Sequence, residues 1–340
     1  MTTATGTPAK AVAVEPRMDT RTRGLLVDWK LALGLLAVLA LLAASLFTGA
    51  YDVFGADDGA AMFVITRIPR TIALVLSGAA MAMAGLVMQL LTQNRFVEPT
   101  TTGTIEWAGL GLVAVMILWP TAPLLARMGV AVAFAFVGTM VFFLFLRHVA
   151  LKSSLIVPIV GIMLGAIVGA LSTFIALSTG MLQNLGVWFA GSFITASRGQ
   201  YEVLWIVLLV LVAVFWLADR LTVAGLGQDI CTNVGLDYNR IILTGASLVA
   251  VATGVVTVVV GNLPFLGLIV PNVVSLFRGD DLRSNLPWVC LLGIGIVTIC
   301  DLISRTIIMP FEVPVSLVLG VLGALVFIFL LLRQRRRGAI

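Results

Sequence analysis

Long apolar runs, divided by short polar segments, fill most of this chain. A helix needs about 20 apolar residues to cross a bilayer core about 30 Å thick, and several runs reach or approach that length. These runs are residues 31–50, 72–91, 107–126, 128–146, 155–177, 203–218, 241–260, 263–277, 286–300 and 313–332. They are continuous rather than alternating, which excludes a membrane β-barrel, and backbone groups in lipid pair within helices. The pattern therefore predicts an all-α, polytopic membrane protein with about ten transmembrane helices.

Three of these runs are short for a span, namely 203–218, 263–277 and 286–300. Pro264 and Pro271 interrupt the second of them, and proline removes a backbone donor, so we expect this helix to be broken or tilted. The composition agrees with a membrane protein, because 60% of the 340 residues are hydrophobic, 11% are charged and the mean hydropathy is +1.13. Soluble domains carry about 25% charged residues.

Both ends of the chain are polar. Residues 1–29 are basic and contain prolines and glycines, which predicts a disordered cytoplasmic tail, and residues 336–340 form a second short tail. The run 31–50 is too long, and begins too late, for an ordinary cleaved signal peptide. We therefore expect an uncleaved first helix and a single membrane domain over residues 30–335.

Ten spans place both termini on one side of the membrane, and the Lys and Arg residues identify that side because cytoplasmic loops are enriched in them. With the termini inside, sixteen of the 21 Lys and Arg residues are cytoplasmic. The five on the outside are Arg67, Arg70, Arg127, Arg198 and Arg305. The charge bias therefore predicts that both termini are cytoplasmic.

The longest polar interruption in the C-terminal half is Asp219–Arg240, between the runs 203–218 and 241–260. Glycines divide it at positions 225, 227 and 235, and Asp229 and Asp237 lie between the flanking Arg220 and Arg240. We expect one short surface helix here, on the cytosolic side of the membrane.

The ten runs contain no Asp, Glu, Lys, Arg or His. Secondary transporters usually keep ionisable groups at membrane depth for function, so a stand-alone secondary transporter is the less favoured alternative. The chain also lacks the G-x-x-x-x-G-K-[ST] loop that binds nucleotide phosphates. If ATP drives this protein, a separate subunit must bind ATP and Mg²⁺, and this chain binds no cofactor.

Other chemistry receives no support from the sequence. The three cysteines form no C-x-x-C pair, and the single histidine, His148, has no Cys or carboxylate beside it, so no metal site is predicted. No basic cluster is interleaved with aromatics, which argues against nucleic-acid binding. We find no constellation typical of an enzyme. Glycines at three- or four-residue spacing, such as Gly161, Gly165 and Gly169, favour close helix packing over a pathway lining.

Four motifs occur in a fixed order along the chain. They read Arg67-Ile-Pro-Arg70-Thr followed by Gln89 and Asn94, Leu263-Pro-Phe-Leu-Gly-Leu-Ile-Val-Pro271 followed by Arg278-Gly-Asp, Asp301-Leu-Ile-Ser-Arg305, and Glu312-Val-Pro314 followed by Gly320 and Gly323. In this order and spacing they resemble the FecCD family, the permease subunits of ABC importers for iron–siderophores, haem and vitamin B12. The resemblance runs from about residue 30 to 335.

This resemblance implies a ten-helix permease in a bacterial plasma (inner) membrane. It implies pairing with a second permease subunit, either a paralogue or a second copy, with two cytosolic ATPase subunits and with an extracytoplasmic substrate-binding protein. The segment 221–238 matches the family's coupling helices, which sit in a cleft on the ATPase. The residues of this segment expected to contact the ATPase are Leu226, Gly227, Gln228, Asp229 and Gly235.

The resemblance also implies a role for three outer arginines. Arg67, Arg70 and Arg305 match family positions that pair with glutamates of the binding protein, and planar guanidinium groups hold carboxylates in a bidentate way. The alternative for Arg67 and Arg70 is that they only anchor the chain at the membrane interface. The remaining structural or gating candidates are Gln89, Asn94, Pro99, Pro264, Gly267, Pro271, Asp301, Glu312 and Pro314.

The chain departs from the common family pattern at several positions. The usual N-P-L-A-x-P is replaced by Asn94-Arg-Phe-Val-Glu-Pro99, and the positions of a usual histidine and a usual glycine hold Asn272 and Ser316. These changes are similar to a branch that imports catecholate siderophores of the enterobactin or petrobactin kind, often as half of a heterodimer. The expected function is ferric-siderophore import, with haem or vitamin B12 as alternative substrates.

Overall fold

The computed structural model describes residues 29–49, 59–148, 156–279 and 281–337. Apart from one isolated bridge between Ile308 and Phe311, every element that these residues form is a helix. The elements are α1 (Trp29–Phe47), α2 (Gly59–Met62), the π-helical segment η1 (Phe63–Arg67), α3 (Ile68–Leu91), α4 (Thr104–Leu118), α5 (Leu124–His148), α6 (Ile156–Ser178), α7 (Leu182–Phe189), the 3₁₀ segment η2 (Tyr201–Trp205), α8 (Ile206–Gly225), α9 (Gln228–Asn233), α10 (Tyr238–Val259), α11 (Leu266–Arg278), α12 (Leu282–Thr306) and α13 (Val315–Arg337). The predicted all-α class is confirmed. Nearly all of the predicted N-terminal tail lies outside the described residues, whereas α13 continues to Arg337, inside the predicted C-terminal tail.

The ten predicted runs coincide mainly with ten helices, in order α1, α3, α4, α5, α6, α8, α10, α11, α12 and α13. Seven of the described helical segments are long and apolar enough to cross a membrane. Three more are apolar but shorter, Thr104–Leu118, Leu266–Arg278 and Val315–Phe329. The chain is therefore a multi-pass membrane protein.

The helix ends differ from the apolar runs at several places. The run 107–126 is divided, because α4 ends at Leu118 and α5 begins at Leu124, with Pro120 and Pro123 between them. The runs 203–218 and 286–300 belong to longer helices, since α8 continues to Gly225 and α12 spans Leu282–Thr306. Backbone hydrogen bonding continues past the point where side chains become polar, so hydrophobicity alone underestimates helix length.

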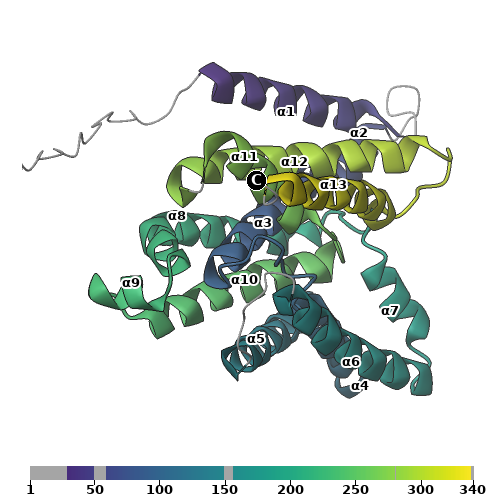
Figure 1. The fold of residues 1–340 in the computed structure, drawn as a ribbon. Helices are drawn as coiled ribbons and strands as arrows, with labels where there is room; N and C mark the ends of the chain where they lie inside the picture. Colours follow the sequence, from purple (N-terminus) through teal and green to yellow (C-terminus); the bar gives the residue numbers. More distant parts are fainter. Residues whose placement is uncertain (1–28, 50–58, 149–155, 280, 338–340) are drawn as a thin grey trace, which may run out of the picture.

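Helix α3 lies at the centre of the bundle and contacts α8, α10, α11 and α12 (Figure 1). Its second half packs directly against α11, where Gly85 faces Gly267 so closely that a Cβ on Gly85 would collide with the backbone of Gly267. Only glycine allows this approach of two backbones. Pro271 lies inside α11 without ending it, and Pro264 precedes the helix.

A second group of helices surrounds α4, which contacts α5 and α6, and α10 connects this group to α3 (Figure 1). Helix α1 lies on the opposite side of the bundle, along α12. Many side chains on α1, α6 and α13 are apolar and exposed, such as Leu36, Ile167 and Leu325. Exposed apolar faces of this kind suit a lipid environment, because lipid tails solvate them as a protein core would.

Candidate functional site

The three arginines predicted to dock a binding protein come together at one end of the bundle. Arg67 ends η1, Arg70 lies in the first turn of α3, and Arg305 lies in the last turn of α12. They surround Asp301 of α12 and Glu312 of the connection between α12 and α13. We call these five residues the arginine–carboxylate cluster.

Arg70 holds both carboxylates of the cluster. Its Nε and Nη2 donate to Oδ1 of Asp301 at 3.2 and 2.7 Å, and its Nη1 and Nη2 donate to Oε1 and Oε2 of Glu312 at 3.0 and 2.7 Å. The pair with Glu312 is the bidentate arrangement in which Arg binds carboxylates best. Every nitrogen of this guanidinium therefore has a carboxylate partner within the chain.

Arg305 is the most buried arginine of the cluster, with 3% of its surface exposed. It donates to the second oxygen of Asp301, to the side chain of Ser45, and to the carbonyl groups of Ser45 and Thr48 at 3.1 and 3.0 Å. These bonds connect α12 to the end of α1. Arg305 thus acts in this conformation as a link between helices.

Arg67 is half-buried and lies against the end of α1, where its Nη1 donates to the carbonyl oxygen of Thr48. The cluster contains three arginines and two carboxylates, so it carries one excess positive charge. The predicted roles of all three arginines in docking stay predictions. The structure adds that Arg70 and Arg305 are paired inside the chain.

The predicted coupling segment contains the short helix α9, as expected, although Leu221–Gly225 belongs to the end of α8. Gly227 precedes α9 with φ 113° and ψ 164°, and Gly235 follows it with φ 83°. Both conformations are readily reached only by glycine. Gln228 and Asp229 are exposed in the first turn of α9.

An apolar strip lies exposed along the same segment. Leu226 is 60% exposed. Ile230 of α9 is 45% exposed, and Val234, the residue that caps the end of α9, is 65% exposed. Ile230 and Val234 are four residues apart and therefore lie on the same side of the helix. Cys231 points the other way and is buried. Large exposed apolar side chains on an otherwise polar segment are typical of a protein–protein contact.

The connection between α3 and α4, residues 92–103, packs against α11. Glu98 is fully buried, and its Oε1 accepts a hydrogen bond from the backbone N–H of Phe265 at 2.9 Å. Gln89 donates to the carbonyl of Gly267 at 3.1 Å, and Asn272 donates to that of Arg95 at 2.7 Å. Glu98 is not among the residues predicted from the sequence, although it occupies the variable position of the N-P-L-A-x-P motif.

Most of the other predicted structural or gating residues lie around the same contact. Asn94 is buried and accepts from the backbone N–H of Phe96 at 2.9 Å, and Pro99 is buried beside Glu98. A hollow of about 250 Å³ lies between the ends of α3 and α8 and the middle of α11, and Gln89, Asn94 and Pro271 help to line it. Pro314, by contrast, precedes α13 next to the arginine–carboxylate cluster.

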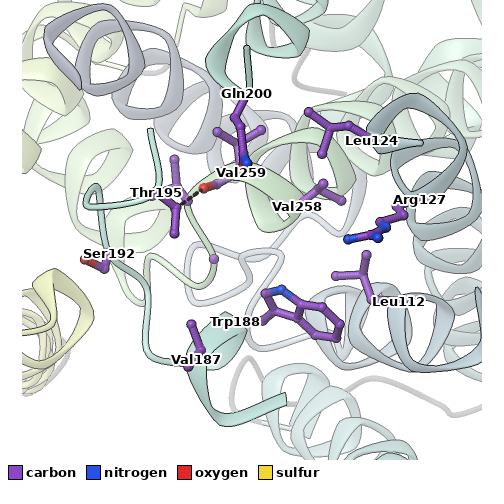
Figure 2. A pocket seen from close by; sticks show the side chains of 12 residues that line it. Leu112, Leu124, Arg127, Val187, Trp188, Ser192, Thr195, Gln200, Val258 and Val259 are labelled. Atoms are coloured by element: carbon purple, nitrogen blue, oxygen red, sulfur yellow. Dashed lines mark hydrogen bonds between the residues drawn. The ribbon is translucent and has the colours of Figure 1, made fainter. Parts of the chain in front are cut away.

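Figure 2 shows another hollow, of about 130 Å³, between α4, α5, α7 and the end of α10. The side chains of Arg127 and Trp188 face it from α5 and α7, and Arg127 Nε donates to the carbonyl of Ala122 at 3.0 Å. No predicted site residue lines this hollow. Its volume is well below the roughly 300–1,000 Å³ of small-molecule sites, so we do not place a transported substrate in it.

Within the described ranges, no group of three or more His, Cys, Asp or Glu side chains is placed to hold a metal ion. Cys231, Cys290 and Cys300 are free thiols and are at least partly buried. Buried thiols of this kind behave as small apolar side chains. The chemistry that the site offers is therefore the binding of carboxylates by arginine and the contact of apolar surfaces.

Comparison with known proteins shows which proteins the chain is related to. The chain is 61% identical over 304 residues to the petrobactin import system permease protein FatD of Bacillus anthracis, covering 89% of this chain and 91% of that protein. It is 39% identical over 307 residues to the petrobactin import system permease protein YclN of Bacillus subtilis, covering 88% and 96%.

A solved structure of a metal-chelate type ABC transporter in an inward-facing conformation has the same fold. It matches with a TM-score of 0.77 at 21% identity and covers 90% of this chain and 99% of that one. The sequence profile of the FecCD transport family matches residues 31–333. The chain belongs to the FecCD transport family, as its four motifs predicted.

Proposed function

We propose that this chain is the permease subunit of an ABC importer that carries a ferric siderophore into a bacterial cell across the plasma membrane. The observation that carries this proposal is the 61% identity, over nearly the whole chain, to a protein described as a petrobactin import permease. A second relative at 39% identity carries the same description. We therefore favour a siderophore of the petrobactin type over haem or vitamin B12.

In this proposal all ten apolar helices cross the membrane and both termini are cytoplasmic. The two shorter helices, α4 with 15 residues and α11 with 13, would then cross as partial spans inside the bundle, where neighbouring helices protect their ends. Helix α13, with 23 residues, is long enough for a full span. The excess of Lys and Arg on the inner side supports this orientation. It places the arginine–carboxylate cluster outside and α9 inside.

The same orientation gives each exposed feature a partner. The apolar strip of Leu226, Ile230 and Val234 would contact an ATPase, which supplies the energy because this chain has no nucleotide-binding loop. The excess positive charge near Arg67 would receive an acidic side chain of the substrate-binding protein. The permease pairs with a second permease subunit, so that the substrate passes between them without chemical change.

Uptake measurements test this proposal directly. Purified chain, with its sister permease and the ATPases of the same import system, is reconstituted in proteoliposomes and supplied with the binding protein and ⁵⁵Fe-labelled petrobactin. We expect uptake only when ATP, the ATPases and the binding protein are all present. Uptake by this chain alone, independent of ATP, would instead support a secondary transporter.

A charge reversal tests the outer surface. Arg67→Glu should abolish uptake while protein levels in the membrane stay unchanged, because it replaces an attraction with a repulsion at the docking surface. Arg198→Glu is the matched control, since Arg198 is exposed and predicted to lie on the same side but outside the cluster. Equal uptake by Arg67→Glu and the control would contradict a docking role for Arg67.

A further inference from the structure

The two carboxylates that hold Arg70 differ in how they are placed. The side chain of Asp301 has no exposed surface and also binds Arg305, whereas 26% of the Glu312 side chain is exposed. Among the described residues, the side chain of Glu312 hydrogen-bonds only to Arg70. Asp301 is thus a fixed part of the helix packing, and Glu312 is a ligand of Arg70 that can be reached from the surface.

Glu312 could leave Arg70 without unfolding its surroundings. The next residue, Val313, is fixed to α12 because its backbone N–H donates to the carbonyl of Ser304 at 3.1 Å and its own carbonyl accepts from the Ser304 hydroxyl. A rotation of the Glu312 side chain is therefore enough to free one edge of the guanidinium. Arg70 would keep its two hydrogen bonds to Asp301.

The surface beside Glu312 has the composition of a protein contact. The turn before it exposes more than half of each of four large apolar side chains, Ile307, Ile308, Met309 and Phe311. This turn lies at the end of the bundle, between the end of α12 and the start of α13. Aromatic residues and Met beside a buried Arg are enriched at the centres of protein interfaces.

We propose that Glu312 is an internal stand-in for a partner's carboxylate, and that docking of the substrate-binding protein replaces Glu312 on Arg70 while the turn Ile307–Phe311 forms the apolar contact beside it. This inference rests on the proposed function, because it assigns the acidic partner to the outer face of an importer. It adds that Glu312, within the permease itself, competes with the partner's carboxylate for Arg70.

The burial of Arg70 explains why only a carboxylate can replace Glu312. In the free permease a buried guanidinium needs carboxylate partners, because an uncompensated buried charge is strongly destabilising. A partner's carboxylate can take the place of Glu312 at little net cost, because one bidentate pair is exchanged for another. A neutral side chain cannot do so. Glu312 therefore favours an acidic partner. Because Glu312 competes for Arg70, it also weakens the binding of that partner enough for release after each transport cycle.

The test measures the affinity of the binding protein for the full importer in nanodiscs at low salt, by biolayer interferometry. The probe is the binding protein of the same import system, loaded with ferric petrobactin. Glu312→Gln should tighten binding by about three- to tenfold, since it removes the competing charge. Glu312→Asp, which keeps the charge, should stay nearer the wild-type affinity.

Two further variants separate the possible outcomes. Glu202→Gln removes an exposed carboxylate outside the cluster and should leave the affinity unchanged. If Arg67→Glu abolishes binding but Glu312→Gln weakens it or leaves it unchanged, the docking surface stands and the exchange is wrong. If neither variant alters binding, the docking surface itself is misplaced and both proposals fail.

Discussion

The carboxylate of Glu98 accepts a hydrogen bond at 2.9 Å from the backbone amide of Phe265, which is 167 residues away in the chain. Phe265 directly precedes α11, and the amides of Gly267 and Leu268 lie near the same carboxylate. Glu98 therefore caps the N-terminus of α11 from a different segment, because it accepts a hydrogen bond from an amide that the helix leaves unpaired. This contact fixes the connection between α3 and α4 to α11.

Removal of this cap should loosen α11. We expect Glu98→Ala to cost about 1–2 kcal/mol of stability, as the loss of a capping acceptor typically does. Glu98→Gln should cost less, because its amide oxygen still accepts from Phe265. Thermal unfolding of the purified chain in detergent measures both variants. Equal stability of Glu98→Ala and wild type would show that other contacts hold α11.

The arginine–carboxylate cluster leads to a second prediction. Asp301 binds Arg70 and Arg305 at once and is fully buried, so Asp301→Ala leaves two buried guanidinium groups short of a partner. We expect a loss of about 3–5 kcal/mol, the range for breaking a buried ion pair by removing one partner. Glu312→Gln should lower the melting temperature far less, because Arg70 keeps Asp301. A similar loss in the two variants would contradict the difference in their roles.

The apolar runs and the motifs allowed much of this structure to be predicted. Each run overlaps a helix. Arg67 and Arg70 of the first motif and Arg305 of the third meet at one end of the bundle. The partners of Arg70 could not be predicted, because Asp301 and Glu312 are 231 and 242 residues away. A single sequence does not show which helices pack together, and pairing depends on that packing.

Two other features were missed for different physical reasons. The end of α8 lies seven residues beyond its apolar run, because helical hydrogen bonding does not stop where hydrophobicity does. The burial of Glu98 was not predicted because this residue lies between two apolar runs, where a carboxylate is ordinarily solvated. Its burial follows from the packing of residues 92–103 on α11.

The contact between Gly85 and Gly267 supports a third prediction. A Cβ on Gly85 would collide with the carbonyl and Cα of Gly267, which are backbone atoms and cannot rotate away. Gly85→Ala should therefore separate α3 from α11 and destabilise the chain by about 1–3 kcal/mol, as overpacking does. Gly129→Ala in α5 is the control, because no atom lies within 4 Å of its added Cβ. Detergent melting curves that shift equally for both variants would contradict the prediction.

The exposed strip on the coupling segment supports the last prediction. Ile230 lies on the exposed apolar face of α9, and Thr232, also exposed, lies on a different face because two residues turn a helix by about 200°. Ile230→Glu should reduce association with the ATPase subunits by at least about tenfold, since it buries an unpaired charge in an apolar contact. Thr232→Glu adds the same charge away from that face and should reduce it much less.

Co-purification of the ATPases with each variant, together with ATP-dependent uptake in proteoliposomes, measures this difference. Both substitutions lie on a short exposed helix, so neither should lower the melting temperature of the isolated chain, and a loss of association can be assigned to the contact itself. If Thr232→Glu disrupts association as strongly as Ile230→Glu, the ATPase contacts α9 through another face. The strip of Leu226, Ile230 and Val234 would then be free to lie against lipid instead.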